Sequence, residues 1–252
     1  MAEPLLVRRQ GAVLTLALNR PDKRNALSRE LIARLADALD AADLDAEVRV
    51  VVLRGEGRDF CAGADLAELL ASAAREVGEN EADALRLGEL FLRIRQLPKP
   101  VVAAVHGNAL AGGCGLATAC DLVVAAESAK FGYPEIQRGF VPAMVLVILR
   151  RLVGERVAFD LVGTGRVLMA EEAAELGLVS RVAPDGELEQ MLASVVDPLS
   201  TGSSTALALT KKLLYELDGR EFAEGIRLGA RVNAIARTTP DFRERIERFL
   251  SR

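Results

Sequence analysis

The sequence predicts an α/β protein, because apolar runs typical of buried strands alternate with amphipathic segments typical of helices. The chain has 252 residues, of which 50% are hydrophobic. A chain of this size can bury a substantial core in one large domain, or in one domain with an appendage. We expect early strands at Ala12–Asn19, where the apolar residues alternate, and at Val48–Gly55, which is largely apolar.

The segments around these strands continue the pattern. Ser28 is a suitable N-cap for a helix that ends near Ala42. A further helix is expected to end near Leu97, before the apolar strand Val101–Val105. The stretch ATACDLVVA then indicates a short helix followed by another strand. Strand, helix and strand therefore repeat along the first half of the chain.

The second half of the sequence is mostly helical from Val141 onward, with Gly177–Val182 as the one convincing late strand. The stretch DPLSTGSS indicates a turn before a helix that opens at Ser203. We therefore expect a core over residues 1–195 and a C-terminal helical region over residues 196–252. The polar stretch 75–83 is predicted to be a loop and is the best candidate for a mobile lid.

Composition excludes several classes of function. The net charge is −4 without a basic block, which does not favour nucleic-acid binding. The longest strongly apolar run, Phe140–Leu149, is too short to cross a bilayer, so we expect no membrane association. The stretch MAEPLLVRRQ lacks the apolar core of a signal peptide, so we expect a cytoplasmic protein.

The few cysteine and histidine residues limit the chemistry further. Cys61, Cys114 and Cys120 are odd in number and lack the spacing of metal ligands, so neither a disulfide framework nor a zinc site is expected. His106 is the only histidine, which excludes a multi-histidine metal centre. It follows an apolar strand and precedes Gly107, and we expect a hydrogen-bonded structural residue.

The stretch GNALAGGCGL, residues 107–116, follows a buried strand and leads into a helix. Glycine lets the backbone approach a ligand, and the first N–H groups of a helix lack intrahelical partners. Such a turn can hold a phosphate or an oxyanion, or it can simply allow tight packing. The spacing fits neither the dinucleotide fingerprint nor a Walker A loop, so a nucleotide site is not expected.

Four segments together resemble the crotonase (enoyl-CoA hydratase/isomerase) superfamily over nearly the whole chain. The resemblance implies a ββα-spiral core with a C-terminal helical region that builds homotrimers, often stacked as homohexamers. It also implies acyl-CoA thioesters as ligands, with coenzyme A as part of the substrate and no separate cofactor or metal. The segments are Leu18–Ser28, Phe60–Leu66, Pro98–Pro142 and Thr164–Val182.

An acyl-CoA reaction places negative charge on the thioester oxygen, which fixed N–H donors in a dry site can stabilise. The resemblance implies that the backbone N–H groups of Ala64 and Gly112 form this oxyanion hole. Each turn alone could equally be a tight chain reversal. The occurrence of both turns in the order of the family favours the oxyanion hole.

The carboxylates distinguish the reactions of the superfamily. Its hydratases use two glutamates, and Glu135 matches the second while Gly115 stands at the first position. One carboxylate suffices to move a proton from C2 to C4, so the sequence favours a 3-enoyl-CoA to 2-enoyl-CoA isomerase over a hydratase. A non-catalytic acyl-CoA-binding paralogue is a further alternative. Asp65 and Glu68 could supply another carboxylate, although helix capping is the favoured interpretation for both.

The resemblance also implies a coenzyme A site. Lys23, Arg24 and Ala26, with the backbone at Ala62 and Asp65, are expected to border the pantetheine and the nucleotide. The two basic side chains could equally be solvated.

Overall fold

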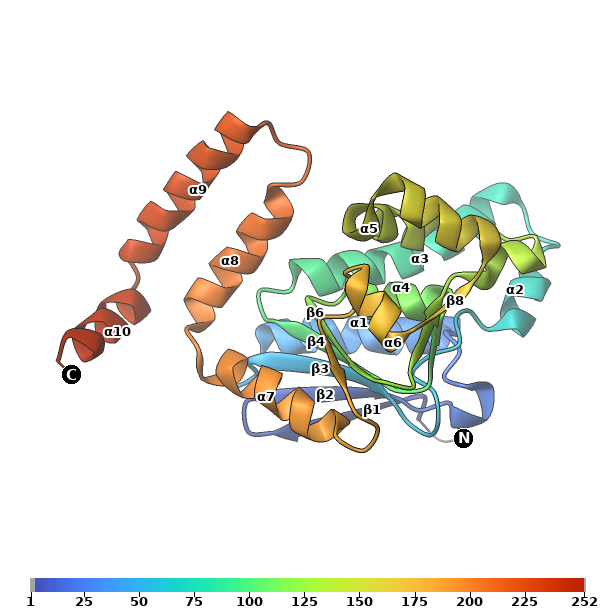
Figure 1. Cartoon of the computed structure of the whole chain (residues 1–252), viewed down its shortest axis with the longest axis horizontal. Coiled ribbons are helices and arrows are strands. Elements are labelled where there is room, and N and C mark those ends of the chain that lie inside the picture. The colour runs from blue at the N-terminus through green and yellow to red at the C-terminus, as the bar shows by residue number, and fades with distance from the viewer. Residues whose placement is uncertain (1–2, 252) are drawn as a thin grey trace.

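The computed structural model describes residues 3–251 and shows an α/β core from which helices project at the C-terminus (Figure 1). The strands are β1 (Leu5–Gln10), β2 (Val13–Leu18), β3 (Val50–Gly55), β4 (Val101–Val105), β5 (Asn108–Leu110), β6 (Leu122–Ala126), β7 (Lys130–Gly132), β8 (Val167–Met169) and β9 (Arg181–Ala183). The helices are η1 (Pro21–Lys23), α1 (Arg29–Leu44), α2 (Leu66–Ser72), α3 (Val77–Gln96), α4 (Gly112–Ala119), η2 (Pro134–Arg138), α5 (Ala143–Thr164), α6 (Ala170–Glu175), α7 (Leu188–Thr201), α8 (Ser204–Glu216), α9 (Phe222–Arg237) and α10 (Pro240–Leu250).

Two sheets form the core. The larger sheet has the strand order β1-β2-β3-β4-β6-β9, with β1 antiparallel to β2 and each later pair parallel. The smaller sheet has the order β5-β7-β8. Parallel neighbours need crossover connections, and helices supply most of them here. The strand–helix alternation expected from the sequence is therefore confirmed.

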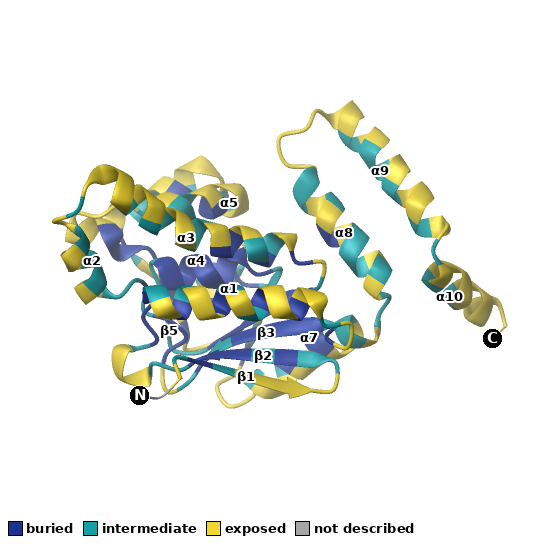
Figure 2. Ribbon diagram, turned by 180° about the vertical axis from the view of Figure 1, so that it is seen from behind, coloured by how far each residue is buried: buried dark blue, intermediate teal, exposed yellow. Residues whose placement is uncertain are grey.

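The parallel strands β3, β4 and β6 of the larger sheet are covered on both faces, which explains their largely apolar sequences. Helix α1 buries Leu31, Leu35 and Leu39, one residue per helical turn, in the main hydrophobic core. Helix α7 buries Leu192 and Val196 in a smaller cluster on β3, β4 and β6. Figure 2 shows the buried strands and the buried stripe of α1 in dark blue, with exposed residues on its outer side.

Local capping signals determine where several helices begin. The Ser28 hydroxyl accepts a hydrogen bond from the Leu31 N–H at 3.2 Å, which confirms the expected start of α1. The Ser203 hydroxyl accepts one from the Ala206 N–H at 3.0 Å and caps α8. The strand β8 was not expected from the sequence, because it has only three residues and pairs with the distant strand β7.

The prediction of a loop at residues 75–83 is wrong. Helix α3 begins at Val77, and Glu76 and Glu79 form a capping box at its start. Further along this segment, Asp83 forms an ion pair with Arg29 of α1 at 2.6 Å. The polar residues of the segment lie largely on the outer side of a solvated helix, so their composition does not indicate a lid.

The C-terminal helices leave the core at Gly202 (Figure 1). Position 195, the expected boundary, lies within α7, which continues along the sheet to Thr201. Helices α9 and α10 have no buried residue, and large apolar side chains such as Phe222 are exposed on them. Among the described residues, no helix combines the length and the apolar character needed to cross a membrane.

Candidate active site

A cavity of about 370 Å³ opens where the loop after β2, the loop before α2, the start of α4 and the η2–α5 connection meet. Every site residue expected from the sequence lines this cavity. They are Lys23, Arg24, Ala26, Ala62, Ala64, Asp65, Gly112 and Glu135. Residues from four distant segments are therefore brought together in one place.

The two glycine-containing turns lie against each other. A Cβ atom on Gly63, whose φ is +102°, would lie only 2.8 Å from the Cβ of Ala111. The position of a Cβ on Gly112 is 4.0 Å from the backbone nitrogen of Ala64. Gly63 thus permits a backbone approach that a side chain would prevent. The N–H groups of Ala64 and Gly112 are neighbours as a result.

Both N–H groups are available to a ligand. Within residues 3–251, neither the Ala64 nor the Gly112 N–H donates a hydrogen bond to a protein acceptor. Gly112 is the first residue of α4, where backbone donors have no intrahelical partner. The preceding residue, Ala111, has φ 52° and ψ −127°, a backbone conformation that is strained for alanine. Strained residues of this kind cluster at functional sites. The pair can stabilise a developing oxyanion.

Glu135 is the buried carboxylate of the cavity. It belongs to η2, which begins at Pro134, and only 6% of its surface is exposed. Its Oε2 atom has no hydrogen-bond partner among the described residues. Burial raises the pKa of Glu135 above its usual value, and the positive charge of Arg138 partly opposes this rise. A raised pKa suits a group that must both accept and return a proton near neutral pH.

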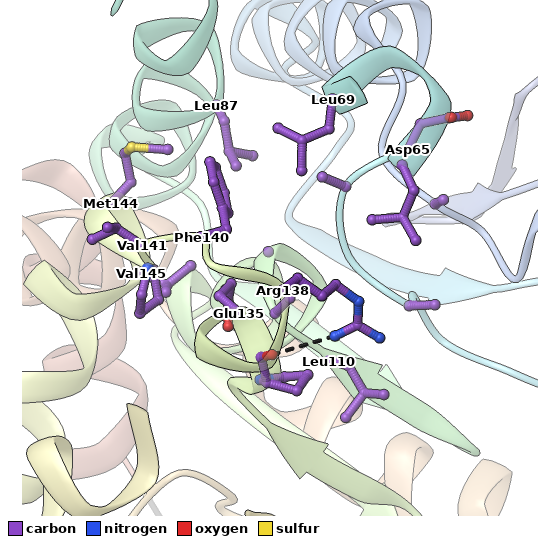
Figure 3. A pocket seen from close by; sticks show the side chains of 18 of the residues that line it. Asp65, Leu69, Leu87, Leu110, Glu135, Arg138, Phe140, Val141, Met144 and Val145 are labelled. Carbon is purple, nitrogen blue, oxygen red and sulfur yellow. Dashed lines mark hydrogen bonds between the residues drawn. The ribbon is translucent and has the colours of Figure 1, made fainter. Parts of the chain in front are cut away.

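Arg138 lies beside Glu135 at the cavity wall (Figure 3). Its Nη1 atom donates a hydrogen bond to the carbonyl oxygen of Pro134 at 3.3 Å. The side chain thus folds back over the start of η2, which keeps its charge near the catalytic candidate Glu135. Sequence reasoning did not single out Arg138, although its place three residues after Glu135 in a short helix was a usable signal.

The remaining wall of the cavity is apolar and was not expected from the sequence. It comes mainly from α2, α3 and the segment that joins η2 to α5 (Figure 3). The apolar residues are Leu66, Leu69, Leu87, Leu110, Phe140, Val141, Met144 and Val145. The run FVPAMVLVIL carried the signal, because it begins at Phe140, shortly after Glu135, and contains Phe140, Val141, Met144 and Val145 of this wall. This wall suits an acyl chain.

Gly115, the position at which the sequence departs from the hydratase pattern, is buried within α4 and does not line the cavity. A Cβ atom there would overlap the side chain of Val145 and lie 3.1 Å from Cζ of Phe91. The space beside Gly115 is therefore filled by its neighbours.

The other two candidate carboxylates are engaged in capping. Asp65 caps α2 by accepting a hydrogen bond from the Ala67 N–H at 3.1 Å, and it accepts another from Nη2 of Arg20 at 2.8 Å. The hydrogen bond from Arg20 is the main cause of a lowered pKa of Asp65. Glu68 accepts a hydrogen bond from the Arg29 N–H at 3.0 Å, at the start of α1. The capping interpretation is confirmed for Asp65 at its own helix, whereas Glu68 binds the first N–H of the neighbouring helix α1.

Arg24 and Lys23 differ in whether their positive charge is paired with other described residues of the protein. The Nε atom of Arg24 donates a hydrogen bond to Asp59 Oδ2 at 2.9 Å. Burial opposes ionisation of Asp59, but Arg24 and Asn108 outweigh it and lower its pKa to about 2. No hydrogen bond joins the Lys23 ammonium to another described residue, and it lines the cavity. Lys23 thus has the more available charge.

The remaining polar candidates lie outside the cavity. His106 forms a hydrogen bond through Nε2 with the carbonyl oxygen of Gly57 at 2.8 Å, so the structural interpretation is confirmed. Cys61, Cys114 and Cys120 are buried free thiols. The part of the chain from residue 3 to residue 251 contains no cluster of metal-ligating side chains.

Known proteins are similar to this chain in both sequence and fold. The enoyl-CoA hydratase/isomerase family model matches residues 8–252. A Thermus thermophilus protein named as a candidate enoyl-CoA hydratase is 46% identical, over 96% of each chain. The Escherichia coli 2,3-dehydroadipyl-CoA hydratase is 36% identical over 98% of this chain and 96% of its own.

Solved structures agree with these sequence matches. The crystal structure of an enoyl-CoA hydratase from Mycobacterium smegmatis superimposes with a TM-score of 0.94 at 35% identity, covering 98% of this chain and 96% of the other. The expected crotonase fold is thereby confirmed. With the two turns and Glu135 meeting in one cavity, the chain belongs to the enoyl-CoA hydratase/isomerase family.

Proposed function

We propose that the protein shifts the double bond of a 3-enoyl-CoA to give the 2-enoyl-CoA. The observation that carries this proposal is that the buried carboxylate of Glu135 and the N–H groups of Ala64 and Gly112, which have no hydrogen-bond partner among residues 3–251, meet in one cavity. An isomerase needs one base that removes a proton and returns it, together with donors for the charge that develops between these steps.

The reaction follows from these groups. The thioester oxygen accepts hydrogen bonds from the Ala64 and Gly112 N–H groups, which makes the C2 proton more acidic. The Glu135 carboxylate removes this proton, and the charge spreads over a dienolate whose oxygen stays between the two donors. Glu135 then returns the proton at C4, and the double bond moves into conjugation with the thioester. The apolar wall excludes water, which strengthens both interactions.

The surroundings of Gly115 support isomerisation over hydration. Hydration in this family is expected to use a second glutamate at this position, and Val145 and Phe91 fill the space beside it. Asp65 and Glu68 are held by their capping contacts. Water addition would therefore have to proceed with Glu135 alone.

Hydration of a 2-enoyl-CoA is the second candidate function, because the similar proteins described above carry hydratase names. Turnover of purified protein with paired 2-enoyl-CoA and 3-enoyl-CoA substrates tests the proposal directly. The proposal requires faster conversion of the 3-enoyl-CoA. Faster formation of a 3-hydroxyacyl-CoA from the 2-enoyl-CoA would establish the hydratase instead.

A non-catalytic acyl-CoA-binding protein is a third candidate. The burial of an unpartnered carboxylate costs free energy, and retention of such a group beside two free donors favours an active enzyme. Exchange of the C2 proton of an acyl-CoA with deuterated solvent separates these cases, because it requires the base and the oxyanion hole without a complete reaction. Binding without exchange would support the non-catalytic protein.

Coenzyme A recognition is proposed for the part of the cavity that Lys23 and Arg24 line. These residues place two positive charges there, and Ala26, Ala62 and Asp65 line the same cavity. Phosphate groups bind well to such charges. We further propose assembly as a homotrimer or homohexamer through the projecting C-terminal helices, whose apolar side chains are exposed.

A further inference from the structure

The segment that carries Ala64 is joined to the loop after β2 by a parallel β-bridge between Leu27 and Ala64. The Leu27 N–H donates a hydrogen bond to the carbonyl oxygen of Gly63 at 2.8 Å, and the Asp65 N–H donates one to the carbonyl oxygen of Leu27 at 3.0 Å. Both bonds involve the residues that flank Ala64, so the N–H of Ala64 itself points away from Leu27. The bridge therefore sets the direction of one proposed oxyanion donor.

Arg20 clamps this bridge from the side. Its Nη2 atom donates a hydrogen bond to Oδ2 of Asp65 at 2.8 Å, and its Nη1 atom donates one to the carbonyl oxygen of Ala26. These two acceptors directly flank the bridged residues Leu27 and Ala64, so one guanidinium contacts both segments of the bridge. A planar guanidinium holds two acceptors in a fixed relative geometry, which a single point charge does not do.

The backbone of Arg20 is also held in place. Its N–H donates a hydrogen bond to Oδ1 of Asn25 at 2.8 Å, and its carbonyl oxygen accepts one from the Asn25 N–H at 2.9 Å. The side chains of Arg20 and Asp65 are only 21% and 13% exposed, and salt screens such a partly buried ion pair less than an exposed one. Arg20 is therefore anchored at both ends and can support the bridge.

The two carboxylate oxygens of Asp65 make different contacts. Oδ1 accepts a hydrogen bond from the Ala67 N–H at 3.1 Å and caps α2, whereas Oδ2 binds Arg20. Figure 3 shows the Asp65 carboxylate pointing away from Glu135. A helix cap needs only the first of these oxygens. Capping of α2 thus explains Oδ1 and leaves the ion pair with Arg20 without a role in the helix.

We infer that Arg20 is a positioning residue of the oxyanion hole, which keeps the Ala64 N–H directed at the thioester oxygen by clamping the bridge to Leu27. This inference rests on the proposed function, because it requires Ala64 to donate to the oxyanion. Arg20 does not line the cavity, so it acts through the bridge and not on the substrate. A donor must already point at the place where charge develops. Arg20 should therefore affect the charged intermediate and not the binding of a neutral acyl group.

The test compares a stable oxyanion with a neutral ligand. Acetoacetyl-CoA loses its C2 proton to solvent and becomes an enolate with its own ultraviolet absorption, whereas the acyl group of butyryl-CoA stays neutral. Arg20→Met should lower the ratio of enolate to keto form in bound acetoacetyl-CoA by about ten- to a hundredfold at fixed pH, since a misplaced donor loses most of its effect. The affinity for butyryl-CoA, measured by isothermal titration calorimetry, should change little.

Asp65→Asn should reproduce this loss, because asparagine can still cap α2 but no longer offers Arg20 a charge. The double variant Arg20→Met/Asp65→Asn should lose no more than the stronger single variant, since both changes remove one contact. Arg29→Met is the matched control. It removes the ion pair between Arg29 of α1 and Asp83 of α3, lies outside the cavity, and should leave the enolate ratio unchanged.

An Arg20 that only stabilises the fold predicts a different result. Arg20→Met and Asp65→Asn would then melt at lower temperature, while the folded proteins would keep the wild-type enolate ratio. That outcome would overturn the inference and leave the proposed function intact. If Arg20→Met does not fold, as judged by circular dichroism, the enolate ratio of Asp65→Asn decides.

The wild-type protein separates the inference from the proposed function. Binding of acetoacetyl-CoA without enrichment of the enolate over its share in free solution would refute the proposed oxyanion hole and the assignment of Arg20 with it. Enrichment that both variants lose, in a wild-type protein that does not turn over 3-enoyl-CoA, would refute the proposed isomerase and support the assignment of Arg20.

Discussion

Val145 packs so closely against Gly115 that it leaves no room for a side chain at position 115. A Cβ atom on Gly115 would overlap Cγ1 of Val145 and would lie 3.1 Å from its Cβ. Both residues are buried, Gly115 in the interior of α4 and Val145 in the first turn of α5. Val145 therefore occupies the space that a glutamate side chain at position 115 would need.

This packing changes what a glutamate at position 115 is expected to do. Gly115→Glu alone should destabilise the protein by about 1–3 kcal/mol from overpacking, with a further cost for the buried carboxylate. Gly115→Glu combined with Val145→Gly should recover part of this loss and raise water addition to 2-enoyl-CoA. Thermal denaturation and hydration assays of the single and double variants check this. A single variant as stable as the wild type would contradict the packing argument.

Glu135→Gln should reduce double-bond migration by about a thousandfold or more, because the amide keeps the shape of the side chain and cannot accept the proton. Acyl-CoA binding should be retained. Glu68→Gln is the matched control, since Glu68 caps α1 and does not line the cavity. If Glu135→Gln still isomerises 3-enoyl-CoA, another acid such as Asp65 carries the reaction.

Arg138→Ala should shift the acidic limb of the kcat/KM profile to higher pH. Burial raises the pKa of Glu135, and the Arg138 charge lowers it by favouring the carboxylate. Loss of this charge therefore raises the pKa further, and the base becomes protonated at a higher pH than in the wild type. Arg138→Lys keeps the charge and should move the limb less. A shift toward lower pH would refute the assigned interaction.

Gly112→Pro removes one of the two proposed oxyanion donors. Activity should fall by about two to three orders of magnitude, as loss of one such donor does in other enzymes. Proline is tolerated at the first position of a helix but also restricts the residue before it, here Ala111 with φ 52° and ψ −127°, so circular dichroism must establish that the variant is folded. Gly112→Ala retains the N–H, and its Cβ would meet Leu27 at an ordinary 3.4 Å. Near-normal turnover by folded Gly112→Pro would eliminate the proposed oxyanion hole.

The projecting helices should assemble the protein into trimers or pairs of trimers. Phe222 and Ile226 of α9 are 85% and 61% exposed, and apolar surface of this kind requires cover in water. Light scattering at micromolar concentration checks the mass of the assembly. Ile226→Glu should weaken it, whereas Glu224→Gln on the same helix should not. A monomeric wild-type protein would contradict the prediction.

The sequence alone determined the features that depend on neighbouring residues. Apolar runs identified β2, β3 and β4, and hydroxyl caps identified the starts of α1 and α8. The resemblance to the crotonase superfamily located the glycine turns and Glu135, and the expected site residues all line one cavity. The strand and capping signals are local, because capping and strand alternation act over a few residues.

Only the tertiary structure decided what fills the space around these residues. In the sequence, the polar start of α3 fits a loop or a solvated helix equally well. In the structure this segment is helical, and its Asp83 forms an ion pair with Arg29 of α1. The three-residue strand β8 exists because β7 lies beside it. Likewise, the sequence shows glycine at position 115, where a second glutamate was expected for a hydratase. Only the structure shows that Val145 fills the space beside this glycine. These outcomes depend on side chains distant in sequence, whose volumes meet only after the chain has folded.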